Sequence, residues 1–226
     1  MLFGGGLFPV YAAGAADVAT LSRFLRGLFV VSTLLALASE LAWLATAIAN
    51  MTGDWTDIGD PEVLHSALLE TQFGQVWMVR MALTVILLIL AFLRFSISSR
   101  GGRELSVSLS GILLATLALT GHAAAHKGGL GDIHRLNQAI HLLAGGAWLG
   151  GLAPLGWVLA TARRTGSAAA VGWAATVVRR FSLMGYWAVG LVLLTGTVNG
   201  IFLVGSFGAL VGSQYGRVLL GKVVLV

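Results

Sequence analysis

Long apolar stretches separated by short polar loops run through most of the chain. Several extend for about 20 residues or more, the length at which an α-helix spans the hydrocarbon core of a bilayer. Seven apolar segments can be counted, and the first and last look too short to span. Their approximate bounds are 1–16, 24–50, 73–95, 105–125, 134–161, 181–204 and 215–226. The pattern predicts an all-α fold, a polytopic helical membrane bundle that forms one transmembrane domain over residues 1–226.

Two parts of the chain resemble each other in the same orientation. The matched pairs are TQFGQVWMVRMAL at 71–83 with SQYGRVLLGKVVL at 213–225, and GGLFP at 5–9 with GGLAP at 150–154. They predict a parallel internal repeat, with segments one to three corresponding to five to seven. Repeat A covers about 1–125 and repeat B about 134–226. We therefore expect eight helices in all, with helix eight and the start of helix one missing from this sequence.

The composition supports a membrane protein. Hydrophobic residues make up 57% of the chain and charged residues only 10%, whereas about a quarter of a soluble domain is charged. The formal net charge of +5 does not indicate nucleic-acid binding, because the basic residues lie in short loops between the apolar segments. Cysteine is absent, which excludes disulfides and thiolate metal sites and leaves His, Met and carboxylates as possible ligands.

The loops alternate in charge along the chain. Arginines follow segments one, three and five, whereas the loop over 51–70 is acidic and the loop after segment four carries histidines. Because basic loops stay in the cytoplasm, the acidic loop and the histidine loop should face the other side. In a bacterial inner membrane, that side is the periplasm.

Four of the five histidines lie within residues 121–151. His122 and His126 share a helix face if helix four extends that far, and His134 and His141 are two turns apart on helix five, about 10.5 Å of rise. Because the loop KGGLGD is short, helices four and five should be antiparallel neighbours. We therefore expect two layers, with His126 near His134 at the loop and His122 near His141 below it.

Imidazole is a suitable ligand for copper, zinc, nickel and iron. The alternative is that the histidines near loops, including His65, are ordinary polar groups at the interface. His141 lies inside an apolar helix, about two turns from its start, where a polar side chain is costly and usually functional. We expect its ring to face helix four or the bundle interior.

Further polar or soft side chains fall on the same half of the predicted bundle. Glu40 and Arg80 lie at similar depths in helices two and three, so we expect them to form an ion pair. The alternative for Arg80, and for Lys222 at its repeat position, is that the side chain snorkels to the interface. Met78 and Met81 are further candidates, because their thioethers suit Cu(I). Trp148 is another, because it lies on the same helix face as His141. The alternative for all three is ordinary packing.

Several motifs together resemble the copper resistance D family of bacterial inner-membrane proteins. They are GHAAAH at 121–126, HRLNQAIHLLAGGAWLGGLAPL at 134–155, RRFS at 179–182, TQFGQVWMVR at 71–80 and SQYGRVLLGK at 213–222. The resemblance covers nearly the whole chain. It implies about eight helices and copper uptake across the inner membrane, often beside a periplasmic copper-binding protein of the copper resistance C type. By motif match it implies His122 and His141 as the leading ligands, followed by His126 and His134.

The leading hypothesis is a lipid-embedded copper transporter that is not an enzyme. One alternative is a membrane b-type cytochrome in which His122 and His141 ligate haem. Against it, an electron path across the membrane needs histidines on the inner half as well, where the sequence has none. The other alternative is a sensor or assembly factor that binds copper without transporting it.

The charge pattern gives a testable topology. Reporter domains inserted into the acidic loop over 51–70 and into the hairpin loop over 126–133 should both give periplasmic signals in a bacterial host. A cytoplasmic signal from either fusion contradicts the predicted orientation.

Overall fold

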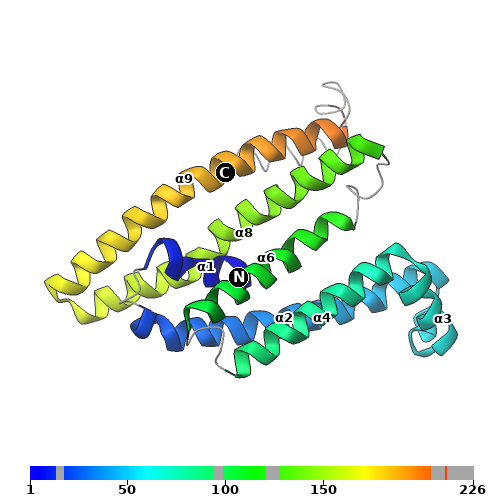
Figure 1. The fold of residues 1–226 in the computed structure, drawn as a ribbon, viewed down its shortest axis with the longest axis horizontal. Coiled ribbons are helices and arrows are strands. Elements are labelled where there is room, and N and C mark those ends of the chain that lie inside the picture. The colour runs from blue at the N-terminus through cyan, green and yellow to red at the C-terminus, as the bar shows by residue number, and fades with distance from the viewer. Residues whose placement is uncertain (14–17, 94–98, 121–127, 205–211, 213–226) are drawn as a thin grey trace.

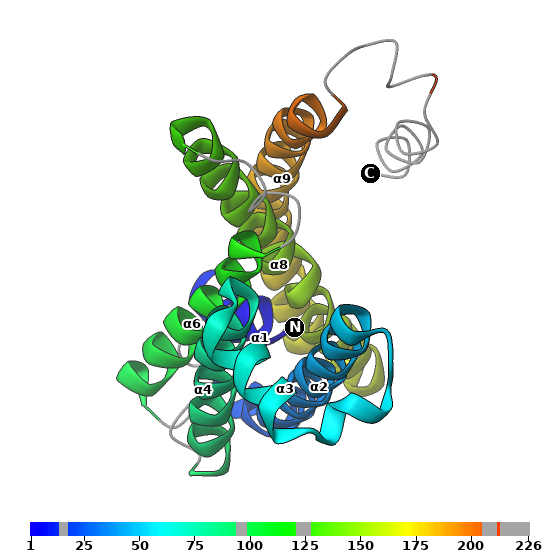
Figure 2. The ribbon, with the colours of Figure 1, turned by 90° about the vertical axis from the view of Figure 1, so that its right-hand side faces the viewer.

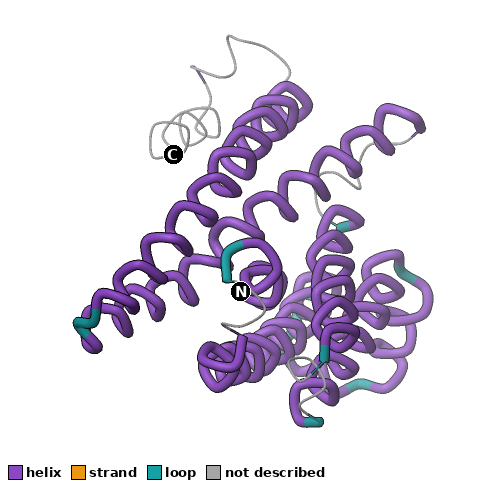
Figure 3. Tube along the Cα trace, turned by 60° about the vertical axis from the view of Figure 1, so that its left-hand side comes forward, coloured by secondary structure: helices purple, strands orange, loops and turns teal. Residues whose placement is uncertain are grey.

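The computed structural model describes residues 1–13, 18–93, 99–120, 128–204 and 212. Within these residues the chain is helical, with short connections and no strand (Figures 1 and 3). The helices are α1 (Leu2–Tyr11), α2 (Val18–Thr52), α3 (Pro61–His65), α4 (Gln72–Phe92), α6 (Arg100–Ala115), α8 (Gly128–Thr165) and α9 (Ala168–Val204). Short 3-10 turns η2 (Thr56–Gly59) and η4 (Thr116–Leu119) and the π-helical turn η3 (Ser66–Glu70) complete them. The prediction of an all-α fold is confirmed.

Five of these helical stretches are long and apolar enough to cross a membrane. They are Thr20–Thr52, Gln72–Phe92, Arg100–Leu119, Gly128–Thr165 and Ala168–Phe202. The prediction of a polytopic membrane bundle is therefore confirmed. Helices α2, α8 and α9 have 35, 38 and 37 residues, which corresponds to about 52–57 Å at 1.5 Å per residue. Since the hydrocarbon core is about 30 Å thick, each of them extends beyond it.

The spans alternate in direction, so the bundle has two distinct ends. One end, called here the histidine end, holds the C-termini of α2 and α9, the N-termini of α4 and α8, and the turn η4; α3 lies there as well (Figure 1). The opposite end, the arginine end, holds the α8–α9 connection with Arg163 and Arg164 in the last turn of α8. The acidic loop thus lies at the same end as the start of α8.

Helix α1 lies between the other helices (Figure 2) and crosses α8 at glycines. A Cβ atom at Gly4 would lie 2.3 Å from the carbonyl oxygen of Gly146 and 2.7 Å from Cα of Gly150. Backbone contact of this kind is possible because small residues spaced four apart leave no side chain between the helices. The crossing brings together the segments 5–9 and 150–154 that the predicted repeat aligns.

Apolar side chains pack most densely near the arginine end. Phe8, Leu21, Val158, Val177 and Phe181 belong to one buried cluster contributed by α1, α2, α8 and α9. A smaller cluster of Phe29, Leu87, Ala91 and Leu113 joins α2 to α4 and α6. The apolar packing therefore holds the bundle together away from the polar groups described below.

The structure corrects the expected boundaries around the histidine hairpin. Helix four was expected to reach residue 125, but η4 ends at Leu119 and Thr120 is extended, with φ −126° and ψ 160°. The hydroxyls of Thr116 and Thr120 bond to the carbonyls of Leu113 and Leu117, and such local bonds compete with the helical pattern.

Helix five begins earlier than expected, because α8 starts at Gly128 and includes most of the expected KGGLGD loop. Gly128 has φ +75°, a conformation that glycine adopts without steric cost. Packing against α9 then outweighs the poor helix propensity of the glycines that follow. The expected segment 215–226 lies outside the described residues.

The glycine crossing predicts a specific loss of stability. Gly4→Ala should lower the free energy of unfolding by about 1–3 kcal/mol, because the added methyl group forces the helices apart. Gly156→Ala, also in a long helix but with no atom within 4 Å of the added Cβ, is the matched control and should be neutral or stabilising by up to about 1 kcal/mol. Thermal unfolding in detergent measures both, and equal stabilities would show that the crossing tolerates side chains.

Candidate functional site

Two groups of polar side chains lie inside the spans. The first, called the histidine cluster, joins α8 to α9 and consists of His134, Asn137, Gln138, His141, Thr195 and Asn199. The second, called the ion-pair cluster, joins α2, α4 and the turn η4 that follows α6, and consists of Glu40, Arg80, Thr84 and Thr116. Each is held together by side-chain hydrogen bonds between helices.

His141 is half-buried on α8 and contacts α9. Its Nδ1 lies 2.9 Å from Oγ1 of Thr195. The Thr195 hydroxyl donates its one proton to the carbonyl oxygen of Leu191 at 2.5 Å, so its oxygen is left to accept from Nδ1–H of His141. This arrangement favours the neutral tautomer with its proton on Nδ1, in which Nε2 carries the lone pair.

The hydrogen bond found for His141 comes from α9. The ring was predicted to face helix four or the bundle interior, and the partner expected from helix four, His122, lies outside the described residues. His141 also lies thirteen residues after Gly128, about three and a half turns into the helix rather than two. The ring is consequently deeper than its position in the sequence pattern indicated.

His134 is buried rather than placed in an outer layer at the loop. Only 2% of the residue is exposed, and its ring stacks on Phe202 of α9 with centroids 4.6 Å apart and planes 5° from parallel. The earlier start of α8 explains this difference, because His134 follows six residues of helix instead of opening it.

Amide side chains fill the space between the two histidines. Asn137 Nδ2 donates to the Thr195 carbonyl and to Asn199 Oδ1, both at 2.8 Å, and Asn199 Nδ2 donates to Gln138 Oε1 at 2.7 Å. Sequence reasoning missed Asn137, Gln138, Thr195 and Asn199. The spacing 134, 137, 138, 141 was the available signal, because it places four polar residues on one face of an apolar helix.

The other predicted ligands are not brought together in the described part of the chain. His122 and His126 lie outside the described residues, and His65 is exposed in α3. Met78 and Met81 are half-buried on α4. Across the described ranges, no group of three or more His, Asp or Glu side chains is arranged to hold a metal ion.

Trp148 lies on α8 beside α9. A Cβ atom at Gly185 would lie 3.7 Å from the Trp148 ring, and the ring packs against the apolar cluster of the arginine end. These contacts give Trp148 a packing role.

Glu40 and Arg80 form the predicted ion pair, with Arg80 Nη2 3.3 Å from Glu40 Oε1. The two residues are 2% and 8% exposed, so the prediction of pairing is confirmed and the snorkelling alternative is wrong for Arg80. Lys222 lies outside the described residues.

Two further hydrogen bonds hold Glu40. Thr84 Oγ1 donates to Glu40 Oε1 at 3.0 Å, and the indole of Trp77 donates to the backbone carbonyl of Glu40 at 2.8 Å.

Helix α6 holds the arginine from the other side. Arg80 Nη1 donates to the carbonyl of Leu113 at 2.8 Å and to Oγ1 of Thr116 at 2.9 Å, and the Trp43 ring lies 5.6 Å from the guanidinium carbon. The cluster therefore ties three spans together through one buried arginine. Its threonines carried no signal in the sequence, because threonine is common in apolar spans.

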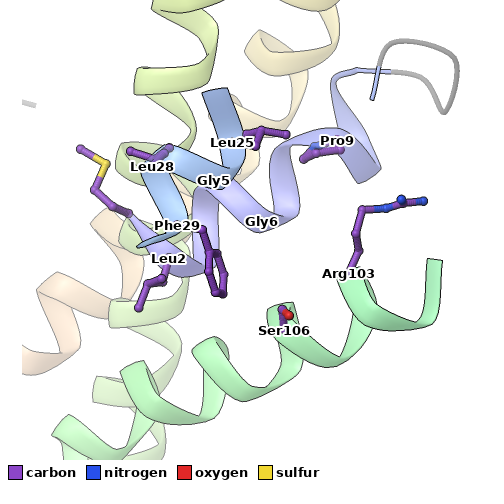
Figure 4. A pocket seen from close by; sticks show the side chains of 10 residues that line it. Leu2, Gly5, Gly6, Pro9, Leu25, Leu28, Phe29, Arg103 and Ser106 are labelled. Carbon is purple, nitrogen blue, oxygen red and sulfur yellow. The ribbon is translucent and has the colours of Figure 1, made fainter. Parts of the chain in front are cut away.

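A small cavity lies apart from both clusters. Figure 4 shows it between α1, α2 and α6, where Leu2, Leu25 and Phe29 contribute apolar walls and Arg103 and Ser106 come from α6. It contains no histidine, and its lining is mostly apolar. We assign it no part in the candidate site.

Comparison with known families covers most of the chain. Residues 1–132 match the family described as copper resistance protein D-like, N-terminal domain, and residues 175–226 match copper resistance protein D. The chain belongs to the copper resistance D family. His134 and His141 lie between the two matched ranges.

Curated members of the copper resistance D family are similar over long stretches. The inner membrane protein YebZ of Escherichia coli is 32% identical over 97% of this chain and 73% of its own length. Copper resistance protein D of Pseudomonas syringae pv. tomato is 31% identical over 100% of this chain and 73% of its own. Copper transport protein CutJ of Bacillus subtilis is 33% identical over 77% of this chain but only 32% of its own length. No solved structure matches.

The ion-pair cluster predicts strong coupling between its two charges. Replacing Glu40 or Arg80 alone by an apolar residue of similar size (E40L or R80M) should destabilise the protein by about 3–5 kcal/mol, because the remaining charge stays buried without its counterion. The double variant should cost less than the larger single change. Unfolding in detergent measures the cycle, and additive losses would mean that the two charges do not depend on each other.

Proposed function

We propose that this chain transports copper ions across the inner membrane of a bacterium, with His141 as a copper ligand in the outer half of the bundle. The observation that carries the proposal is the 2.9 Å contact between Nδ1 of His141 and Oγ1 of Thr195, which favours a proton on Nδ1 and a lone pair on Nε2. The choice of copper as the metal rests on membership of a family named for copper resistance.

The contact with Thr195 is typical of a histidine that binds metal. Such histidines donate their second ring N–H to a neighbouring oxygen, which sets the tautomer and orients the ring. Here the oxygen is held in turn by its bond to the Leu191 carbonyl. A neutral imidazole presented in this way suits copper.

His122 is the proposed second ligand. It lies outside the described residues, and the proposal rests on its place in the motif GHAAAH at 121–126. The packing of α6 on α8, in which the Leu114 side chain lies 2.5 Å from a Cβ placed at Gly146, fixes an antiparallel register. In that register Leu119, the last residue of η4, lies toward the level of His141, which supports a site shared between these helices. His126 and His134 are proposed to act nearer the loop.

The charge of the histidine end favours the approach of cations. Five acidic residues lie in or beside the loop that joins α2 to α4: Asp54, Asp57, Asp60, Glu62 and Glu70. The amide of Thr56 donates to Asp54 and holds the pKa of that carboxyl below its usual range, so it stays charged at mildly acid pH. A negative surface raises the local concentration of cations. We propose that this end faces the periplasm and receives copper there from a binding protein of the copper resistance C type.

Replacing the histidine tests the proposal. His141→Ala should abolish copper binding at the deep site and copper uptake by reconstituted vesicles, because the ligand is lost. Thr195→Val keeps the ligand but removes its orienting oxygen, and should weaken copper binding by about 10–100-fold. Metal analysis of purified protein and vesicle uptake measure both changes.

His65→Ala is the matched control, since His65 is exposed in α3, and it should bind and transport copper as the unmodified chain does. Normal copper uptake by the His141→Ala variant, with the protein correctly inserted, would contradict the assignment.

A further inference from the structure

Glu40 has one oxygen that the ion-pair cluster does not use. Oε1 accepts from Arg80 and Thr84, whereas Oε2 is buried and has no hydrogen-bond partner among the described residues. Glu40 lies twelve residues before Thr52, the end of α2, and so about 18 Å along the helix from that end. A carboxylate oxygen without a hydrogen bond is unfavourable at this depth, because burial opposes ionisation of a group whose oxygens are not all bonded.

Arg80 does not depend on Glu40 for its position. Its Nη1 donates to the Leu113 carbonyl of α6 at 2.8 Å and to Thr116 Oγ1 of η4 at 2.9 Å. Its contact with Glu40 is a single one of 3.3 Å, longer than the 2.7–2.9 Å or so of a strong charge-assisted bond. These two bonds do not involve Glu40, so the arginine keeps them when Glu40 is neutral, although it then lacks its counterion.

We propose that Glu40 is a proton-binding site, with Oε2 as the accepting atom. One proton from the aqueous phase at the histidine end forms an O–H bond at Oε2 and converts the carboxylate into a neutral carboxyl, and its release restores the carboxylate. The charged group that contacts Glu40 is Arg80 of α4, which favours ionisation, while burial favours the protonated form. Helix α6 contributes the Leu113 carbonyl and η4 contributes Thr116, and both groups are uncharged.

The proton site has a consequence for transport that rests on the proposed function. With Glu40 ionised the ion-pair cluster is neutral, and with Glu40 protonated it carries the charge of Arg80. A positive cluster repels a copper ion entering the same half of the bundle. Copper entry and proton release should therefore be linked, which makes the proton the coupled ion.

Infrared spectroscopy of the copper-free chain in lipid vesicles tests the site directly. As the pH falls, the unmodified protein should gain the carbonyl band of a buried protonated carboxyl, and the difference spectrum against Glu40→Gln should contain that band. Glu62→Gln, at an exposed position in α3, is the control and should keep it. If Glu40→Gln does not fold, the double variant Glu40→Gln with Arg80→Met removes both charges and should also lack the band. Identical titrations of the unmodified chain and the Glu40 variant would overturn the proposal.

A second measurement tests the coupling. Copper uptake by vesicles containing a pH-sensitive dye should be accompanied by proton movement with the unmodified chain, and proton movement per copper should fall to background with Glu40→Gln. Copper uptake without proton movement in the unmodified chain would overturn the coupling. Because the infrared measurement requires no copper, failure of the transport proposal is seen separately, as an absence of copper uptake.

Discussion

Polar side chains within the spans must find partners inside the protein, because the hydrocarbon interior of a bilayer offers none. The described helices meet this constraint in two places. Glu40 and Arg80 pair across α2 and α4 with support from α6. The polar face of α8 pairs with Thr195 and Asn199 of α9. These hydrogen bonds determine which helices are neighbours and the axial register between them. Apolar contacts are less directional than hydrogen bonds and specify that register less strictly.

The same constraint gives the two clusters different chemistry. In the histidine cluster, hydrogen bonds link His141, Asn137 and Gln138 to Thr195 and Asn199, and the contact with Thr195 favours an imidazole with a lone pair on Nε2. In the ion-pair cluster the bonding is incomplete, since Glu40 Oε2 has no partner within the described residues. The first arrangement suits a cation ligand and the second suits a proton. The proposed link between copper movement and proton movement depends on having both in one half of the bundle.

The spans and the ion pair could be predicted from the sequence, because both follow from the cost of polar groups in lipid. Long apolar runs predict helices, because a helix satisfies its own backbone hydrogen bonds in lipid. Glu40 and Arg80 lie at similar depths, and pairing lowers the cost of burying both charges. The position of His134 could not be predicted, because α8 begins at Gly128, where composition indicated a loop. The partner of His141 could not be predicted either, because the choice between α6 and α9 depends on the rotation and register of whole helices. Thr195 could be identified as the partner of His141 only from the register of α8 and α9.

The central claim is that Nε2 of His141 binds copper, and X-ray absorption spectroscopy of the copper-loaded protein tests it most directly. The unmodified chain should show imidazole nitrogen at about 2.0 Å from copper, as in other imidazole–metal bonds. The His141→Ala variant, loaded under the same conditions, should lose one such nitrogen from the copper environment. Indistinguishable spectra from the two proteins would contradict the account.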